Sequence, residues 1–162
     1  MSVNRYRPHL LILPEDDANR QLANGFLQNP SVNLRAVQVL PPSGGWAKVH
    51  TDFIESYVAQ LRNHPHGHLA LLIDFDSNVE ERTRFFKKDF PRDVADRVYL
   101  LGTLEEPEPL RVLRRMSLEK IGEELSTSCY EGNDQPWRHD HLQHNLAELQ
   151  RLIANVKPFL YR

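Results

Sequence analysis

Four short apolar runs along the chain predict β-strands. They cover residues 9–13 (HLLIL), 34–40 (LRAVQVL), 69–73 (LALLI) and 98–101 (VYLL). The first, third and fourth runs are almost wholly apolar, which is typical of strands buried on both faces of a sheet. The second run alternates apolar and polar positions, as a half-buried strand does.

Apolar positions at helical spacing between and after these runs predict helices. These helices cover residues 16–27, 49–61, 79–90, 107–125 and 139–160. In the first of them Ala18, Leu22 and Phe26 recur every four residues, which gives one apolar face. Pro107 and Pro109 suit the first turn of the fourth helix.

The order of these elements predicts an α/β fold. Strands alternate with helices up to the fourth strand, and two helices follow, which is typical of a parallel sheet covered on both faces. We therefore predict a small Rossmann-like sheet of about four parallel strands. The 162 residues suit a single domain, with residues 107–162 as a C-terminal helical extension.

Acidic residues follow three of the predicted strands, and in a parallel sheet those strand ends share one edge. They are Glu15, Asp16 and Asp17 after the first strand, Asp74 and Asp76 after the third, and Glu105, Glu106 and Glu108 after the fourth. Residues two apart on an extended segment point the same way, so Asp74 and Asp76 should present two carboxylates together. Like charges held close repel unless a cation lies between them. With Glu15, these carboxylates suit one or two magnesium or manganese ions placed for in-line attack on a phosphodiester.

A capping role competes with this metal hypothesis. An aspartate at a strand end often accepts a hydrogen bond from the first turn of the next helix. Asp76 or Ser77 could cap the predicted helix 79–90 in this way. Acidic residues after several strands favour the metal hypothesis, because capping does not require side chains to converge across a sheet.

The acidic motifs resemble those of the TOPRIM domain, a small parallel α/β fold found in topoisomerases, primases, small RNA-maturation nucleases and OLD-type nucleases. In that domain a glutamate follows the first strand and a DxD motif follows the third. HLLILPEDD and LLIDFD match these motifs, and VQVLPPSGGWAKVHTDF is similar to the OLD-type version. The resemblance covers about residues 8–105. It implies that Glu15 is a general acid or base, or a metal ligand, and that Asp74 and Asp76 hold magnesium.

The resemblance also implies a further acid after the fourth strand, and Glu108 is our assignment among the three acids there. The sequence departs from the family pattern in two places. Asp16 replaces the glycine that commonly follows the first glutamate, which makes Asp16 and Asp17 candidates for extra ligands. The glycine often found after DxD is absent from DFDSNVEER. The chain also has no P-loop, so it is not a full OLD-type protein.

Charge bears on the expected partners. A formal net charge of -2 gives no global basic field that would indicate nucleic acid. Contact with nucleic acid would therefore come from local cations, from the metal or from a partner protein. We predict phosphate contacts from Lys48, Arg82 and Lys87, with a solvated helix face as the alternative for the last two.

Cysteine and histidine usage favours ordinary structural roles. A single cysteine, Cys129, excludes an internal disulfide and fits a reducing cytoplasm, and we predict a cytoplasmic protein without a membrane segment. The groups HPHGH and WRHDHLQH lack cysteine partners, so surface or capping histidines are favoured over zinc ligands.

The leading hypothesis is a stand-alone TOPRIM-like protein with metal-dependent phosphodiester chemistry on DNA or RNA, of the nuclease or nicking type. One alternative is a catalytically inactive TOPRIM-like interaction module that forms a homodimer through helix 139–160. The other is a receiver-like phosphate-handling domain. That pattern has an acidic pair after the first strand, an aspartate after the third and a late lysine. Glu15–Asp17 and Asp74 fit it in part, whereas Lys157 lies in the closing helix.

Overall fold

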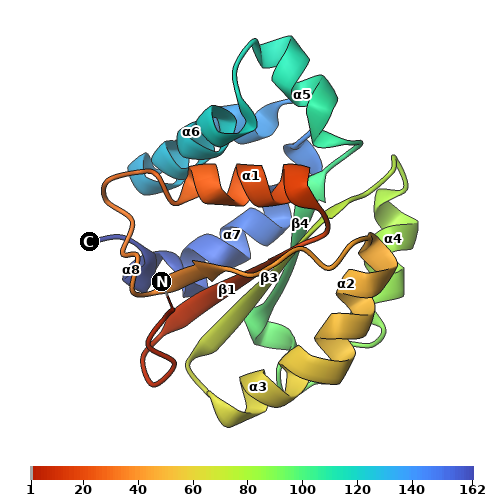
Figure 1. Cartoon of the computed structure of the whole chain (residues 1–162), viewed down its shortest axis with the longest axis vertical. Coiled ribbons are helices and arrows are strands. Elements are labelled where there is room, and N and C mark those ends of the chain that lie inside the picture. Colours follow the sequence, from red (N-terminus) through yellow and green to blue (C-terminus); the bar gives the residue numbers. More distant parts are fainter. Residues whose placement is uncertain (1) are drawn as a thin grey trace.

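Four parallel strands form the centre of the protein, as predicted. The computed structural model describes residues 2–162, and its sheet has the order β2–β1–β3–β4 (Figure 1). The strands are β1 (His9–Pro14), β2 (Val37–Val39), β3 (Gly67–Asp74) and β4 (Val98–Thr103). Leu71 of β3 aligns with Leu13 on one side and Leu100 on the other, so the most apolar run lies inside the sheet.

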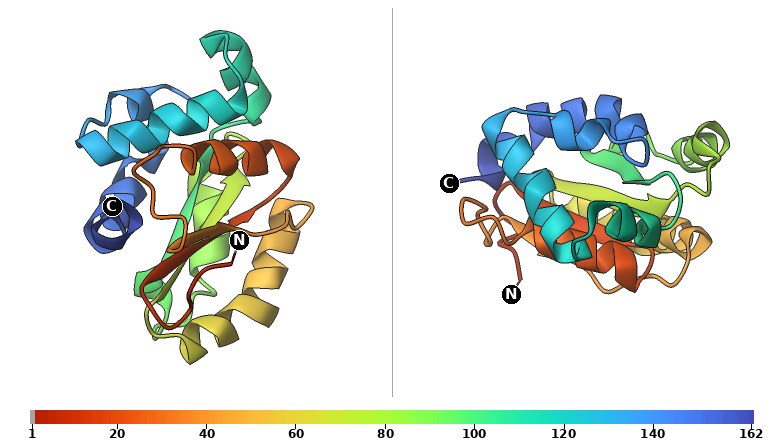
Figure 2. Two further views of the ribbon diagram at one scale, coloured as in Figure 1. Left: turned by 60° about the vertical axis from the view of Figure 1, so that its left-hand side comes forward. Right: turned by 90° about the horizontal axis from the view of Figure 1, so that it is seen from above.

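Helices cover both faces of the sheet (Figures 1 and 2). One face carries α1 (Asp17–Phe26), α6 (Leu118–Glu131), α7 (Leu146–Asn155) and α8 (Lys157–Leu160). The other carries α2 (Trp46–Asp52), a π-helical turn (Phe53–Tyr57), α3 (Val58–Asn63) and α4 (Val79–Lys87). Successive strand residues supply the two cores in turn: Leu10 and Ile12 face α1, whereas Leu11 and Leu13 face α2 and α3.

The first helix packs closely against a helix from the last third of the chain. A Cβ atom added at Gly25 of α1 would lie 2.0 Å from the Glu119 carbonyl oxygen of α6. A Cβ added at Gly122 of α6 would lie 2.1 Å from the Leu22 carbonyl oxygen of α1. Two glycines therefore let the backbones approach each other, and residues from the C-terminal third share a core with the first helix.

The predicted helix 107–125 is in fact two helices. The first is α5 (Pro107–Arg114), which projects at the top of Figure 1. It ends where Arg115 takes a left-handed conformation with φ 53°. Ser117 then caps α6 by accepting a hydrogen bond from the Lys120 N–H at 3.1 Å. Helix α6 runs to Glu131, six residues beyond the predicted end, and stops at Gly132 with φ 74°.

The prediction of one continuous helix over 139–160 is wrong. Short 3-10 turns (Gln135–Arg138 and Gln143–Asn145) precede α7, and α8 follows Val156 as a separate turn. Pro158 cannot donate the hydrogen bond that would continue α7. On the apolar face of the predicted helix 139–160, Leu149 and Val156 are buried in the core. Within residues 2–162, no helix has the length and apolarity needed to cross a bilayer.

The outer edge of β4 is closed by a side chain. Gly102 N–H donates to Asn145 Oδ1 at 3.0 Å, and Asn145 Nδ2 donates to the Gly102 carbonyl at 2.8 Å. One amide thus makes both hydrogen bonds that a neighbouring strand would make at this residue. Asn145 is almost fully buried and is the last residue of the 3-10 turn that precedes α7.

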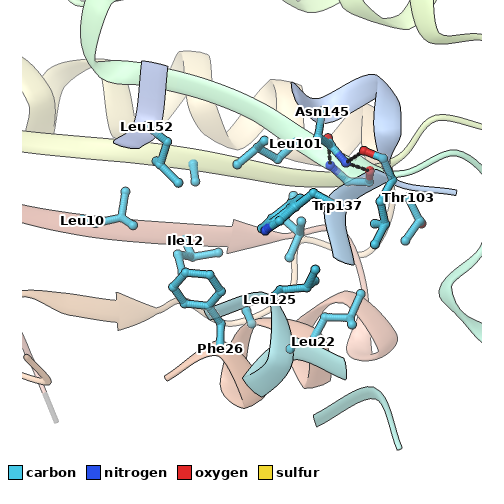
Figure 3. Close-up of a pocket in the computed structure, with 16 residues that line it drawn as sticks. Leu10, Ile12, Leu22, Phe26, Leu101, Thr103, Leu125, Trp137, Asn145 and Leu152 are labelled. Carbon is cyan, nitrogen blue, oxygen red and sulfur yellow. Dashed lines mark hydrogen bonds between the residues drawn. The ribbon is translucent and has the colours of Figure 1, made fainter. Parts of the chain in front are cut away.

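A cavity of about 80 Å³ lies between the sheet and helices α1, α6 and α7 (Figure 3). Its walls are mostly apolar, with Ile12, Leu125 and Trp137 among them. Trp137 Nε1 is buried and has no hydrogen-bond partner among residues 2–162. Thr103 also lines the cavity, and its hydroxyl belongs to the acidic cluster described next.

Candidate metal centre

The candidate site lies where the direction of the strand connections changes. From β1 the chain crosses through α1 to β2, and from β3 it crosses through α4 to β4 on the other side. The crevice between the carboxyl ends of two such strands is the usual ligand site of open α/β sheets. Glu15 follows β1 directly, and Asp74 is the last residue of β3.

Three carboxylates meet in this crevice. Glu15, Asp16 and Asp74 each contribute one oxygen, and these oxygens lie within 4.8 Å of one another. Glu15 and Asp74 are buried, with exposed fractions of 9% and 5%. The Asp74 N–H donates to Glu15 Oε2 at 2.6 Å, which fixes the glutamate against the end of β3. Such a set of oxygens fits a hard divalent cation.

Two uncharged side chains complete the surroundings of the cluster. Asn19 Nδ2 donates to Asp16 Oδ1 at 3.0 Å and to Asp74 Oδ1 at 3.1 Å. Thr103 Oγ1 lies 3.2 Å from Asp74 Oδ1. The Asn19 amide thus places its donor group between two carboxylates. Its Oδ1 is fully buried and has no partner among the residues described, 2–162.

Asp16 also caps a helix. Its Oδ1 accepts a hydrogen bond from the Asn19 N–H at 3.0 Å, so it is the N-cap of α1. Neither Asp76 nor Ser77 caps the helix that follows β3, and the strand-end aspartate that does cap a helix is Asp16. At α4 the N-cap residue is Asn78, and no side-chain hydrogen bond caps that helix.

Burial and nearby negative charges raise the pKa values of Glu15 and Asp74. Burial, opposed by the hydrogen bond from Asp74 N–H and reinforced by the Asp74 and Asp16 charges, raises the pKa of Glu15 to about 7. Burial also raises the pKa of Asp74 to about 6, against the hydrogen bond from Asn19. Near neutral pH, Glu15 and Asp74 therefore either retain protons or carry negative charges that repel each other. A bound cation would offset the repulsion between these charges.

The glycine pair after β2 supports the backbone of the site. Gly44 and Gly45 N–H both donate to the Glu15 carbonyl, at 2.8 and 3.1 Å. The two glycines have φ of 97° and 142°, which side chains rarely tolerate. Lys48 is exposed, and its side chain passes over Gly44, so its amine lies beside the glycine pair.

Asp76 does not belong to the group of three carboxylates. It follows the end of β3 with φ 49°, and its side chain is 52% exposed. Its Oδ2 accepts a hydrogen bond from Arg82 Nη2 at 3.2 Å. Its charge still contributes to the raised pKa values of Glu15 and Asp74, so it is close to the cluster.

The remaining predicted site residues lie further out. Glu108 forms an exposed ion pair with Arg111 on α5. Lys87 pairs with Glu148 of α7 at 2.5 Å. The two other acids after β4, Glu105 and Glu106, line an open hollow with Asp76, Ser77 and Pro109. No cation-binding group among residues 2–162 includes Glu108, and its role as a ligand stays a prediction.

Sequence reasoning missed Asn19 and Thr103. Asn19 lies three residues after the N-cap of α1, where a side chain returns to the cap. Thr103 aligns with Asp74 in the parallel register of β3 and β4. Asn19 could have been found by including the first turn of the helix after β1 among the candidate residues. Thr103 could have been found by including the last residue of β4.

No protein-family model, curated protein or solved structure matches this chain. The findings support a parallel four-stranded α/β sheet with a buried acidic cluster at the ends of two neighbouring central strands.

Proposed function

We propose that the protein binds a divalent cation, Mg²⁺ or Mn²⁺, through Glu15, Asp16 and Asp74. The observation that carries the proposal is the convergence of three carboxylate oxygens within 4.8 Å, two of them on buried residues. The unpartnered, buried oxygen of Asn19 is a second sign that the polar groups here are incompletely satisfied. Burial of two repelling acids costs free energy that a bound cation would recover.

We further propose that the bound cation serves phosphodiester chemistry on nucleic acid. The cation would polarise a phosphoryl oxygen and neutralise developing negative charge. The raised pKa of Glu15, about 7, describes the cation-free site, and a cation held by Glu15 would displace its proton, so cation binding should release protons near neutral pH. Lys48 is the exposed cation beside the glycine pair and would contact a phosphate.

Calorimetric titration with Mn²⁺ and a plasmid-nicking assay test the two steps separately. We expect Asp74→Asn to abolish both cation binding and nicking. Asp93→Asn is the matched control, because Asp93 is an exposed aspartate paired with Arg62 before β4, at the opposite end of the sheet. Failure of the native protein to bind Mn²⁺ would overturn the cation site. Binding without cleavage of any DNA or RNA substrate would overturn the chemistry alone.

A second candidate function is phosphate handling of the receiver type. The observation that favours it is the pairing of Glu15 and Asp16 opposite one buried aspartate, Asp74, while Asp76 is bound by Arg82. In this reaction a phosphoryl group would pass from a small donor to an Asp74 carboxylate oxygen. The P–O bond to the donor breaks and the leaving group departs as an anion.

Acetyl phosphate with Mg²⁺ is the direct test of this second candidate. Transfer would release acetate and leave an acyl phosphate on Asp74, seen by mass spectrometry as a phosphoryl adduct that hydroxylamine removes. The Asp74→Asn variant should show no adduct. An unmodified native protein under these conditions would reject the receiver-type function and leave the cation site unaffected.

A further inference from the structure

Arg82 is buried at the base of the loop that follows β3. Its side chain is only 10% exposed, although arginine is usually a surface residue. Nη1 donates to the Asp74 carbonyl at 3.0 Å, and Nη2 donates to Asp76 Oδ2 at 3.2 Å. The guanidinium also lies over the ring of Trp46, 3.8 Å from its centroid. The end of β3, the loop after it and Trp46 of α2 thus all contact the Arg82 guanidinium beside the carboxylate cluster.

The loop that Arg82 holds is conformationally strained. Asp76 and Ser77 have φ of 49° and 62°, the left-handed region that residues other than glycine seldom adopt. This conformation is energetically unfavourable for a residue that carries a Cβ atom. Hydrogen bonds from Ser77 N–H to the Leu104 carbonyl and from Asn78 N–H to the Phe75 carbonyl offset this cost, at 2.8 and 2.9 Å. The turn sends Asp76 to Arg82, so the extended geometry that would bring Asp76 beside Asp74 is not formed.

The loops after three strands are connected through this arginine. Trp46 follows the glycine pair whose N–H groups bind the Glu15 carbonyl. Arg82 stacks on Trp46 and binds the Asp74 carbonyl, so it joins the glycine loop to the end of β3. The positions of Glu15 and Asp74 are therefore tied to each other through backbone groups as well as side chains.

We infer that Arg82 is a fixed cation of the site, which keeps Asp76 out of the ligand set and limits the protein to one divalent ion. The inference rests on the proposed cation site at Glu15, Asp16 and Asp74. A second dication would need Asp76, whose carboxylate already pairs with the guanidinium. It would also lie close to a positive charge that cannot be deprotonated in proteins. Arg82 is then a positioning residue and not a phosphate contact.

Mn²⁺ titrations of four variants test this assignment. The native protein should bind one ion. Asp76→Asn should weaken binding less than about fivefold, since only a nearby charge is lost, whereas Asp74→Asn should weaken it at least about a hundredfold. Arg82→Gln should tighten binding about tenfold or add a second ion, because Asp76 is released to the cluster. The double variant Arg82→Gln/Asp76→Asn should lose that gain.

The control is Arg84→Gln, which removes the same charge from an exposed position of the same helix. A purely structural role for Arg82 would weaken Mn²⁺ binding in Arg82→Gln and could not produce a gain that depends on Asp76. Two ions in the native protein, or equal losses in Asp76→Asn and Asp74→Asn, would overturn the inference even if Arg82→Gln fails to fold. Absence of Mn²⁺ binding by the native protein would instead overturn the proposed cation site, and the inference with it.

Discussion

Replacing Glu15 by glutamine should change how the free energy of unfolding depends on pH. Burial raises the pKa of folded Glu15 from its ordinary 4.5 to about 7. Between these values the folded protein holds a proton that the unfolded chain has released. The stability that this proton contributes is complete below pH 4.5 and is lost as the pH rises through 7. A pKa displacement of this size corresponds to about 3 kcal/mol.

A buried histidine acts in the opposite direction over nearly the same range. Burial lowers the pKa of His68 from 6.5 to about 4. Unfolded His68 therefore takes up a proton before folded His68 does, and stability is lost as the pH falls from 6.5 towards 4. In the native protein this effect opposes that of Glu15, whereas Asp74, whose pKa burial raises to about 6, adds to the effect of Glu15. The pH profile of the native protein is therefore a poor measure of Glu15, and the difference from a Glu15→Gln variant is the informative quantity.

Urea unfolding followed by circular dichroism, with a chelator at constant ionic strength, gives this difference. The glutamine side chain of the variant keeps an oxygen that can accept from Asp74 N–H, so the hydrogen bond at 2.6 Å can persist. The stability of the native protein minus that of Glu15→Gln should fall by about 3 kcal/mol between about pH 4.5 and 8. Glu55→Gln, which makes the same change at an exposed position, is the matched control. A flat or rising difference for Glu15→Gln would refute the assignment of the shift to burial.

Three further predictions concern packing and reactivity. Gly122→Ala should destabilise the protein by about 3 kcal/mol in urea unfolding, since its Cβ would lie 2.1 Å from the Leu22 carbonyl; the usual gain of alanine in a helix would show that α1 and α6 are further apart. Asn145→Ala should cost about 2 kcal/mol in the same assay, because the buried Gly102 N–H loses its partner and the Gly102 carbonyl keeps only His144 Nε2. A loss below about 0.5 kcal/mol would mean that water replaces the amide. Burial raises the pKa of the Cys129 thiol to about 12, so iodoacetamide should label it only in urea; labelling of the folded protein at the rate of an unfolded peptide would contradict its burial.

The sheet was predictable because its strands are buried on both faces. Leu69 and Leu71 are inaccessible to solvent, and a continuous apolar run is the sequence signature of that environment. The predicted boundaries of elements were less accurate where tertiary contacts determine the local backbone conformation. β2 begins at Val37 and not at residue 34, because Ala36 N–H donates to the Asn33 carbonyl in a turn and Leu34 is 44% exposed. The turn at Asn145 depends on a hydrogen bond to β4, which no local pattern indicates.

The acidic cluster was predictable in outline and not in composition. Glu15 and Asp74 follow neighbouring strands, so topology alone brings them to one edge. Asp16 was only a candidate, because it replaces an expected glycine, and the structure includes it in the group. Asp76 was expected beside Asp74 on the assumption that the strand continues. β3 ends at Asp74, and after the left-handed turn beyond it Asp76 pairs with Arg82, which lies eight residues away from Asp74.

The glycine contact between α1 and α6 also has a consequence for biosynthesis. About a hundred residues separate Gly25 from Gly122, so the ribosome completes α1 and all four strands of the sheet before α6 exists. Until then the apolar face of α1 has no helix to pack against, and exposed apolar surface of this kind is a source of aggregation in unfinished chains. We expect nascent chains that end before residue 118 to depend on chaperones and to acquire resistance to proteases only after α6 has left the exit tunnel.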